Sequence, residues 1–239
     1  ALAARLESLR SRVQWIDGVR ARPKRDVQRT GSAPASLTPN GSNVAEILVE
    51  RPELVEDIRR FYANLNPARD LEVREVLELG HRITLNPKSQ ASFRINLVDT
   101  GEGMAQVLPV LVAAALAARE GPGALLAVEE PESHLHPDAQ TVLARHLCAI
   151  ASSPKPPTLL METHSRVFLL AVQLAIAEGL PSERVGLVWV DQDDAGRSTI
   201  TPVQLEATGH PRAGWPATAL AEDLRLASEL ARLDLNRRG

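Results

Sequence analysis

The chain is poor in cysteine, in aromatic residues and in long apolar runs. It has a single Cys among 239 residues, and Phe, Trp and Tyr together make up 3%. One thiol can form neither an internal disulfide framework nor a zinc site with several thiolates. The longest apolar run, Val107–Ala118, contains Pro109 and is shorter than the roughly 20 residues that a membrane-spanning helix needs. We therefore expect no membrane span and a cytoplasmic protein.

The net charge is also small. The chain has 27 basic and 30 acidic side chains, which gives −3. A charge this close to zero argues against a surface coated with nucleic acid and leaves room only for local basic patches. Hydrophobic residues make up 44% and charged residues 24%, the balance of a folded domain rather than of a disordered chain. At about 100–200 residues per domain, the length fits one large domain or two small ones.

Residues 1–96 are predicted to form a small β-rich subdomain. Helical composition over residues 1–12 precedes a short strand at Val13–Ile16, and residues 44–64 have a helical pattern. Alternation and β-branched content then predict an antiparallel sheet. Its strands are expected at Leu71–Leu79, Arg82–Leu85 and Ser92–Val98.

The segment 17–43 is rich in Gly and Pro and is predicted to be a long loop. Its first half is basic, with Arg20, Arg22, Lys24, Arg25 and Arg29. Loops of this length are usually functional or disordered. The charge pattern leaves two interpretations open, a solvated loop and a segment that contacts phosphate or nucleic acid.

Residues 97–239 show a different pattern, in which apolar strands and helices alternate. Strands are predicted at 124–128, 158–161 and 185–190, and helices at 104–119, 137–151 and 165–178. Such alternation is typical of an α/β fold, a parallel sheet with flanking helices. Asp193–Gly196 is expected to be a hairpin turn that leads to a strand at 198–205, before a final amphipathic helix over 217–235.

Acidic and histidine side chains follow two of these strands. Glu129 and Glu130 come directly after the strand at 124–128, and His164 follows the strand at 158–161. In open α/β sheets, ligands bind at the carboxyl ends of the strands. One carboxylate can hold Mg²⁺ and the next can orient a water, as a nucleotide-hydrolysing site requires.

Two simpler or competing interpretations remain open. The adjacent acids could merely cap the following segment or face solvent. Alternatively, His134 and His136 could join Glu129, Glu130 and His164 in a zinc or manganese site of a metallohydrolase, because imidazole and carboxylate suit these metals.

Three motifs resemble those of one family. The segment from Ala124 to Pro137, ALLAVEEPESHLHP, resembles the Walker B and D-loop region of ABC-type ATPases, in the branch that contains the OLD-like and predicted AAA/ABC ATPases of bacterial defence systems. Leu159–Ser165, LLMETHS, resembles the H-loop strand of this branch, and Asp99–Gln106, DTGEGMAQ, its divergent signature motif. The match covers about residues 97–205.

The resemblance implies a role for each matching residue. Glu129 would order Mg²⁺, Glu130 would be the catalytic carboxylate, and His164 would contact the γ-phosphate of ATP. Thr100, Gly101 and Gly103 would be signature residues whose backbone N–H groups bind a phosphate held by the opposite subunit.

It also implies that Ser133, His134 and His136 lie in a D-loop facing a second copy, so that the enzyme acts as a dimer. Its ATP hydrolysis would be linked to DNA or to anti-phage defence, possible partners being DNA or a defence effector.

One expected motif is missing. The sequence contains no Gly-x-x-x-x-Gly-Lys-Ser/Thr loop, which supplies most of the groups that cradle phosphates. Since the sequence opens Ala-Leu-Ala-Ala-Arg without Met, we expect an N-terminal Walker A lobe on the same or another chain. The alternative is a non-catalytic ATPase-like scaffold.

Overall fold

Three parallel strands form the sheet that carries the candidate site. The computed structural model describes residues 12–32, 34, 36–77, 80–90, 92–219 and 225–230. In it, β4 (Leu125–Glu129) is the central strand, between β1 (Val13–Ile16) and β5 (Thr158–Glu162). Val128 of β4 is level with Ile16 on one side and Met161 on the other. The predicted α/β fold with a parallel sheet is therefore confirmed.

The chain divides into two compact units, Ala1–Val172 and Gln173–Gly239. The boundary expected between residues 96 and 97 falls inside the first unit. The physical reason is the pairing in the sheet. Strand β1 comes before the expected boundary, and its partner in the sheet is β4, which comes after it.

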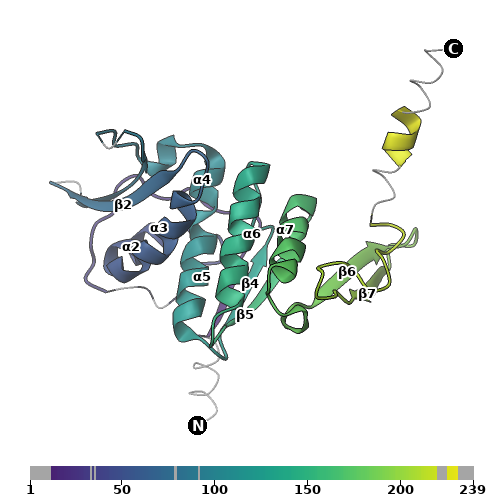
Figure 1. The fold of residues 1–239 in the computed structure, drawn as a ribbon. Helices are drawn as coiled ribbons and strands as arrows, with labels where there is room; N and C mark the ends of the chain where they lie inside the picture. Colours follow the sequence, from purple (N-terminus) through teal and green to yellow (C-terminus); the bar gives the residue numbers. More distant parts are fainter. Residues whose placement is uncertain are drawn as a thin grey trace, which may run out of the picture. The chain divides into compact units, whose positions relative to one another are not determined.

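Two long helices of the first unit lie over one face of this sheet. Figure 1 shows α5 (Leu108–Glu120) and α6 (Pro137–Ala151) in front of the strands. The shorter helices are α2 (Val44–Glu50), η1 (Pro52–Leu54), α3 (Val55–Ala63), η2 (Leu97–Asp99) and α4 (Glu102–Gln106), and α7 (Arg166–Ala177) begins in this unit.

Helix α5 is the core of the first unit. Every residue of Leu108–Ala117 is buried, and burying each Leu or Val side chain contributes about 1.5–3 kcal/mol. Pro109 lies in the first turn, where its missing N–H costs little, and Gly121, at φ 69°, ends the helix. Taken together with α4, the segment Glu102–Glu120 is apolar and long enough to cross a membrane, but 78% of it is buried inside the protein, as expected of a core helix.

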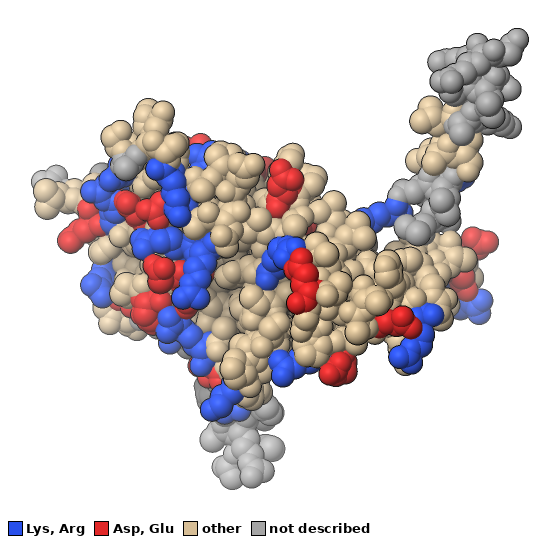
Figure 2. Space-filling model, in the orientation of Figure 1, with Lys and Arg blue, Asp and Glu red and all other residues tan. Residues whose placement is uncertain are grey.

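An antiparallel hairpin flanks this core. It pairs β2 (Arg69–Val76) with β3 (Gly80–Pro87) over eight residue pairs, which confirms two of the three expected strands. Figure 2 shows acidic and basic side chains interleaved over α3 and β2, and Arg59 of α3 is 3.0 Å from Asp70 of β2.

The prediction of a third strand at 92–98 is wrong. The backbone N–H of Leu85 bonds to Ile95, and Asn96 makes a single bridge to Thr84. The Asn96 side chain then accepts a hydrogen bond from the N–H of Val98 and caps η2. This side-chain cap offers the backbone a turn in place of a continued ladder.

The second unit contains a separate hairpin. After η3 (Ser182–Arg184), β6 (Leu187–Gln192) pairs antiparallel with β7 (Ser198–Val203). The hairpin turn at 193–196 is thus confirmed, but the strand expected at 185–190 does not extend the parallel sheet. Its immediate return through the turn gives it β7 as a partner instead.

Two expected helices fall largely outside the described residues. Of residues 1–12 only position 12 is described. Within the helix expected over 217–235, residues 225–230 are helical, but residues 217–219 form a turn, so the expected start at 217 is wrong.

Candidate functional site

The carboxyl ends of β4 and β5 bring the predicted acids and the predicted His to one edge of the sheet. Glu129 is level with Glu162, and the N–H of Glu130 donates a 2.8 Å hydrogen bond to the carbonyl of Glu162. His164 follows two residues later. Glu129 and Glu130 are both partly buried.

The backbone turns sharply at the second acid. Glu130 has φ 41°, in the left-handed region that residues other than Gly rarely adopt. Residues held there cost on the order of 1–3 kcal/mol and persist only where their surroundings fix them. Hydrogen bonds from its N–H to Glu162 and from Arg20 to its carbonyl fix the backbone on both sides of this residue.

Glu129 has a defined partner. Its Oε2 atom accepts a 3.1 Å hydrogen bond from the N–H of Gly18, in the loop after β1. This leaves the other carboxylate oxygen for a cation. Mg²⁺ commonly takes one or two protein carboxylates and completes its shell with waters and phosphates, so the residues at this edge fit Mg²⁺ in that mode.

A buried arginine holds this turn, and sequence reasoning placed it only in a basic loop. Arg20 is 4% exposed and donates to the carbonyl oxygens of Glu129, at 2.8 Å, and of Glu130. Burial lowers the pKa of Arg20, while the carboxylates of Glu132, Glu130 and Glu129 act in the opposite direction. The available signal was its position shortly after β1, which ends at Ile16 and pairs with β4.

Glu132 organises the segment that carries His164. This carboxylate is 6% exposed, and its Oε1 atom accepts hydrogen bonds from the Thr163 hydroxyl at 2.6 Å and from the N–H groups of His164 and Ser165 at 3.2 Å. Ser165 in turn accepts from the N–H of Phe168 at 3.0 Å, which confirms it as the cap of α7. Sequence reasoning assigned Glu132 no role.

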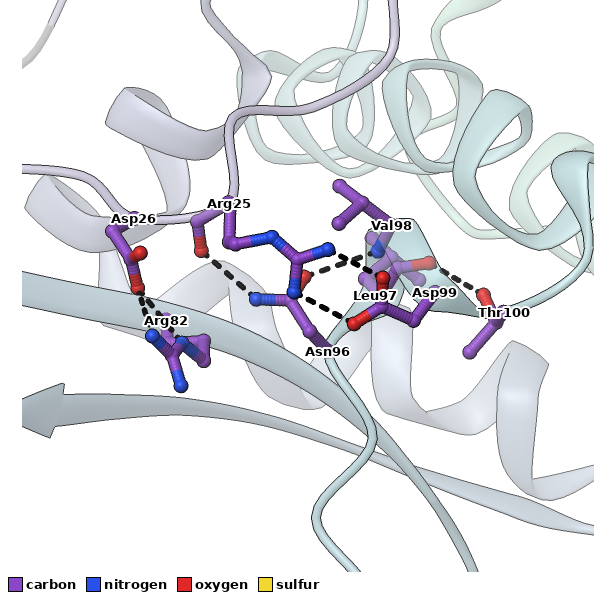
Figure 3. A network of polar contacts seen from close by, with 8 residues as sticks. All are labelled: Arg25, Asp26, Arg82, Asn96, Leu97, Val98, Asp99 and Thr100. Carbon is purple, nitrogen blue, oxygen red and sulfur yellow. Dashed lines mark hydrogen bonds and ion pairs between the residues drawn. The ribbon is translucent and has the colours of Figure 1, made fainter.

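The predicted signature residues lie at the start of α4. Gly101 is the N-cap, and Thr100 bonds through its hydroxyl to the Leu97 carbonyl at 2.6 Å. Figure 3 shows the preceding Asp99 carboxylate paired with both terminal nitrogens of Arg25. These hydrogen bonds hold the pKa of Asp99 below its usual value and raise that of Arg25.

The predicted signature and D-loop segments are in direct contact. A Cβ added to Gly103 would overlap the carbonyl oxygen of His134, so only Gly allows this approach. His134 has φ 63° and is exposed, and Ser133 is partly buried. Thr100 and Gly101 also line a cavity of about 330 Å³ together with His136.

The metallohydrolase alternative is overturned for the described residues. No three His, Cys, Asp or Glu side chains among them lie together as a metal site. His136 instead caps α6, where its Nδ1 accepts from the N–H of Asp138 at 3.4 Å. His134 and His136 therefore lie in the turn before α6 and not on a strand, where residues two positions apart would share a face.

The cations of the basic loop pair with acids of the chain, and all of them except Arg20 remain exposed. Besides buried Arg20, Lys24 pairs with Glu46 at 2.6 Å and Arg29 with Glu50 at 3.4 Å. Arg22 lies 3.9 Å from Glu102. Glu46 and Glu50 both belong to α2 and Glu102 to α4, so these pairs tie the loop to two helices.

Comparisons with solved structures find proteins of low sequence identity. One is described as "Structural biochemistry of ATP-driven dimerization and DNA stimulated activation of SMC ATPases" (14% identity, TM-score 0.49, covering 76% of this chain and 97% of that one). A second is an SmcHead bound to the C-winged helix domain of ScpA (15%, 0.47, 67% and 45%).

A third is an Smc head domain with an extended coiled coil, bound to the C-terminal domain of ScpA derived from Pyrococcus furiosus (13%, 0.46, 79% and 40%). The chain thus spans less than half of the second and third of these proteins. Among curated proteins, no sequence matches it.

A family model matches residues 16–171, which run from the end of β1 through most of the first unit and include every predicted site residue. The model's printed description is "AAA domain, putative AbiEii toxin, Type IV TA system". The chain therefore belongs to this family of AAA ATPase domains.

Proposed function

We propose that the chain supplies the acids and the switch histidine of a Mg²⁺-dependent ATP-hydrolysing site. One observation carries this proposal: the neighbouring ends of β4 and β5 bring Glu129, Glu130 and the His164 segment to the same edge of the sheet. Phosphoryl transfer depends mainly on positioning and on electrostatic stabilisation of charge, and this edge is held by backbone and buried side-chain hydrogen bonds.

Each residue has a distinct task in this proposal. Glu129, fixed by the N–H of Gly18, holds Mg²⁺, which neutralises phosphate charge when it is bound. Glu130, aimed by its left-handed backbone, orients the attacking water and accepts its proton. His164, on a segment tied to buried Glu132, contacts the γ-phosphate.

A second lobe completes the site. The sheet face opposite α5 and α6 carries Trp15, 47% exposed, and Leu160, 59% exposed, which are level with each other across Ala127. Parallel sheets normally have both faces covered. These exposed apolar side chains support a lobe with a Gly-rich, Lys-containing loop that packs here, on the same or another polypeptide.

The active form is a dimer in this proposal. Exposed His134, with Ser133, faces a second copy, and Thr100, Gly101 and Gly103 close on a phosphate bound by that copy. The contact between Gly103 and His134 supports a single surface for both segments. We further propose a cytoplasmic protein whose ATP hydrolysis serves a DNA-linked or anti-phage process.

ATP turnover tests the proposal and separates it from a scaffold. The chain alone should give no heat with ATP in titration calorimetry, because it lacks the Lys-containing loop. Joined to its Walker A lobe, it should release phosphate in a reaction that EDTA stops and Mg²⁺ restores. Tight ATP binding by the chain alone would contradict the two-lobe site. Nucleotide-dependent assembly without phosphate release would establish the scaffold instead.

A further inference from the structure

Arg20 connects two segments that the proposed function uses separately. Its guanidinium donates from Nη2 to the carbonyls of Glu129 and Glu130 at the end of β4, and from Nη1 to the carbonyl of Gln106, 3.4 Å away, at the end of α4. Its Nε atom donates to the carbonyl of Asp17 at 3.1 Å. One side chain thus joins the loop after β1 to α4 and to the end of β4.

The link to α4 runs in both directions. The Nε2 atom of Gln106 donates a 3.0 Å hydrogen bond to the backbone carbonyl of Arg20, while the Arg20 side chain donates to the backbone carbonyl of Gln106. Both side chains are buried. Because buried hydrogen bonds are costly to break without replacement, neither segment can shift without disturbing the other.

The acceptors explain why an arginine occupies this position. A guanidinium offers five N–H donors in a fixed plane, whereas a lysine ammonium is a point charge on a flexible stem. The carbonyls of two successive residues, Glu129 and Glu130, accept from the same nitrogen. Fixing both carbonyls fixes the peptide planes around Glu130, whose φ of 41° needs surrounding support.

We propose that Arg20 is a positioning residue that couples α4, with its signature residues, to the carboxylates at the end of β4. A displacement of α4 then moves the backbone of Glu129 and Glu130, because the Arg20 guanidinium is hydrogen-bonded to both segments. The inference rests on the proposed function for its consequence in catalysis, but its structural part concerns the chain alone.

Hydrogen–deuterium exchange on the 239-residue chain tests the structural part. Arg20→Lys should raise amide exchange at least about tenfold in both 102–107 and 129–132, because several buried acceptors lose their donor. Arg25→Lys, the same change at an exposed position five residues further along, is the matched control and should leave 129–132 unchanged. If only one segment responds to Arg20→Lys, the coupling is absent.

A second variant, at Gln106, breaks the connection from α4 and replaces the buried side chain by one of similar size. Gln106→Met removes only the bond from Gln106 to the Arg20 carbonyl, and the Gln106 side chain makes no hydrogen bond to β4 in the structure. Faster exchange at 129–132 in this variant supports the coupling. Unchanged exchange there overturns it, even if Arg20→Lys fails to fold.

ATP hydrolysis by the protein joined to its Walker A lobe tests the consequence. Arg20→Lys should lower kcat about 10–100-fold with KM for ATP within about twofold, after correction for the fraction of sites that bind nucleotide. A merely structural role would reduce that fraction and leave kcat per site unchanged. If the wild type releases no phosphate, the proposed function fails, while the exchange experiments still decide the coupling.

Discussion

The Thr163 hydroxyl donates a 2.6 Å hydrogen bond to the Oε1 atom of Glu132, which also accepts from the N–H groups of the next two residues. A buried carboxylate from the segment after β4 therefore fixes the start of the segment after β5. This bond holds together the two strand ends on which the candidate site is built.

Removing this carboxylate should destabilise the protein. Glu132→Ala removes the acceptor of the Thr163 hydroxyl and of the His164 N–H, whereas the Ser165 N–H keeps the Thr163 hydroxyl oxygen as a second acceptor. Loss of hydrogen bonds to a charged group costs about 1.5–3 kcal/mol in the free energy of unfolding. Urea unfolding followed by circular dichroism measures the loss. Glu120→Gln, at an exposed position, is the control and should unfold like the wild type. If Glu132→Ala were as stable as the wild type, the hydrogen bonds from Thr163 and His164 to Glu132 would not be formed in solution.

The close approach of α4 to the His134 backbone should tolerate no side chain. In Gly103→Ala the new methyl group meets a backbone carbonyl, which cannot rotate away, and overpacking of this kind costs about 1–3 kcal/mol. Gly101→Ala is the matched control, since a Cβ there meets nothing within 4 Å and φ is −56°. Thermal unfolding of the two variants should differ clearly. Equal melting temperatures would contradict the contact.

The pair of Arg25 and Asp99 should give stability that depends on pH. A carboxyl group with a lowered pKa in the folded state stabilises the protein above its unfolded pKa, near the ordinary value of 3.8. This contribution is lost as pH falls through the folded pKa. Asp99→Asn should therefore have a lower urea midpoint than the wild type at pH 7, and the gap should close below pH 3.8. Asp194→Asn, an exposed acid of the β6–β7 turn, should show no such gap. A gap that persists unchanged in acid would exclude the ion pair as its cause.

The single thiol should be nearly inert in the folded protein. Burial raises the pKa of Cys148 to about 11, from an ordinary value of 9.0, and the thiolate is the reactive form. Two units of pKa correspond to about 100-fold less thiolate at pH 8. Reaction with a disulfide reagent should therefore be at least about 100-fold slower in native buffer than in denaturant. Similar rates in both would show that α6 does not shield this side chain.

The local elements of the site were predictable, because each depends on a short pattern. A five-residue apolar run followed by acids predicts β4 and its strand-end carboxylates, and Pro137 after a polar turn predicts the first residue of α6. Ser165 could be predicted as a cap since its hydroxyl acts within three residues.

The long-range contacts were not predictable from these patterns. Arg20 and Glu129 are 109 positions apart, and nothing in the composition of a basic loop distinguishes the one arginine that becomes buried. The edge position of β5 and the isolated hairpin of β6 also depend on which strands pair, and strand pairing is decided by the whole fold rather than by the strand's own sequence.

The most direct test of the central claim is the ATP turnover of Glu130→Gln in the protein joined to its Walker A lobe, with Glu120→Gln as the control. The account predicts that Glu130→Gln loses phosphate release by at least about 100-fold while it still dimerises with nucleotide in sedimentation analysis, and that Glu120→Gln keeps the wild-type rate. Hydrolysis by Glu130→Gln at the wild-type rate would contradict the assignment of the catalytic carboxylate.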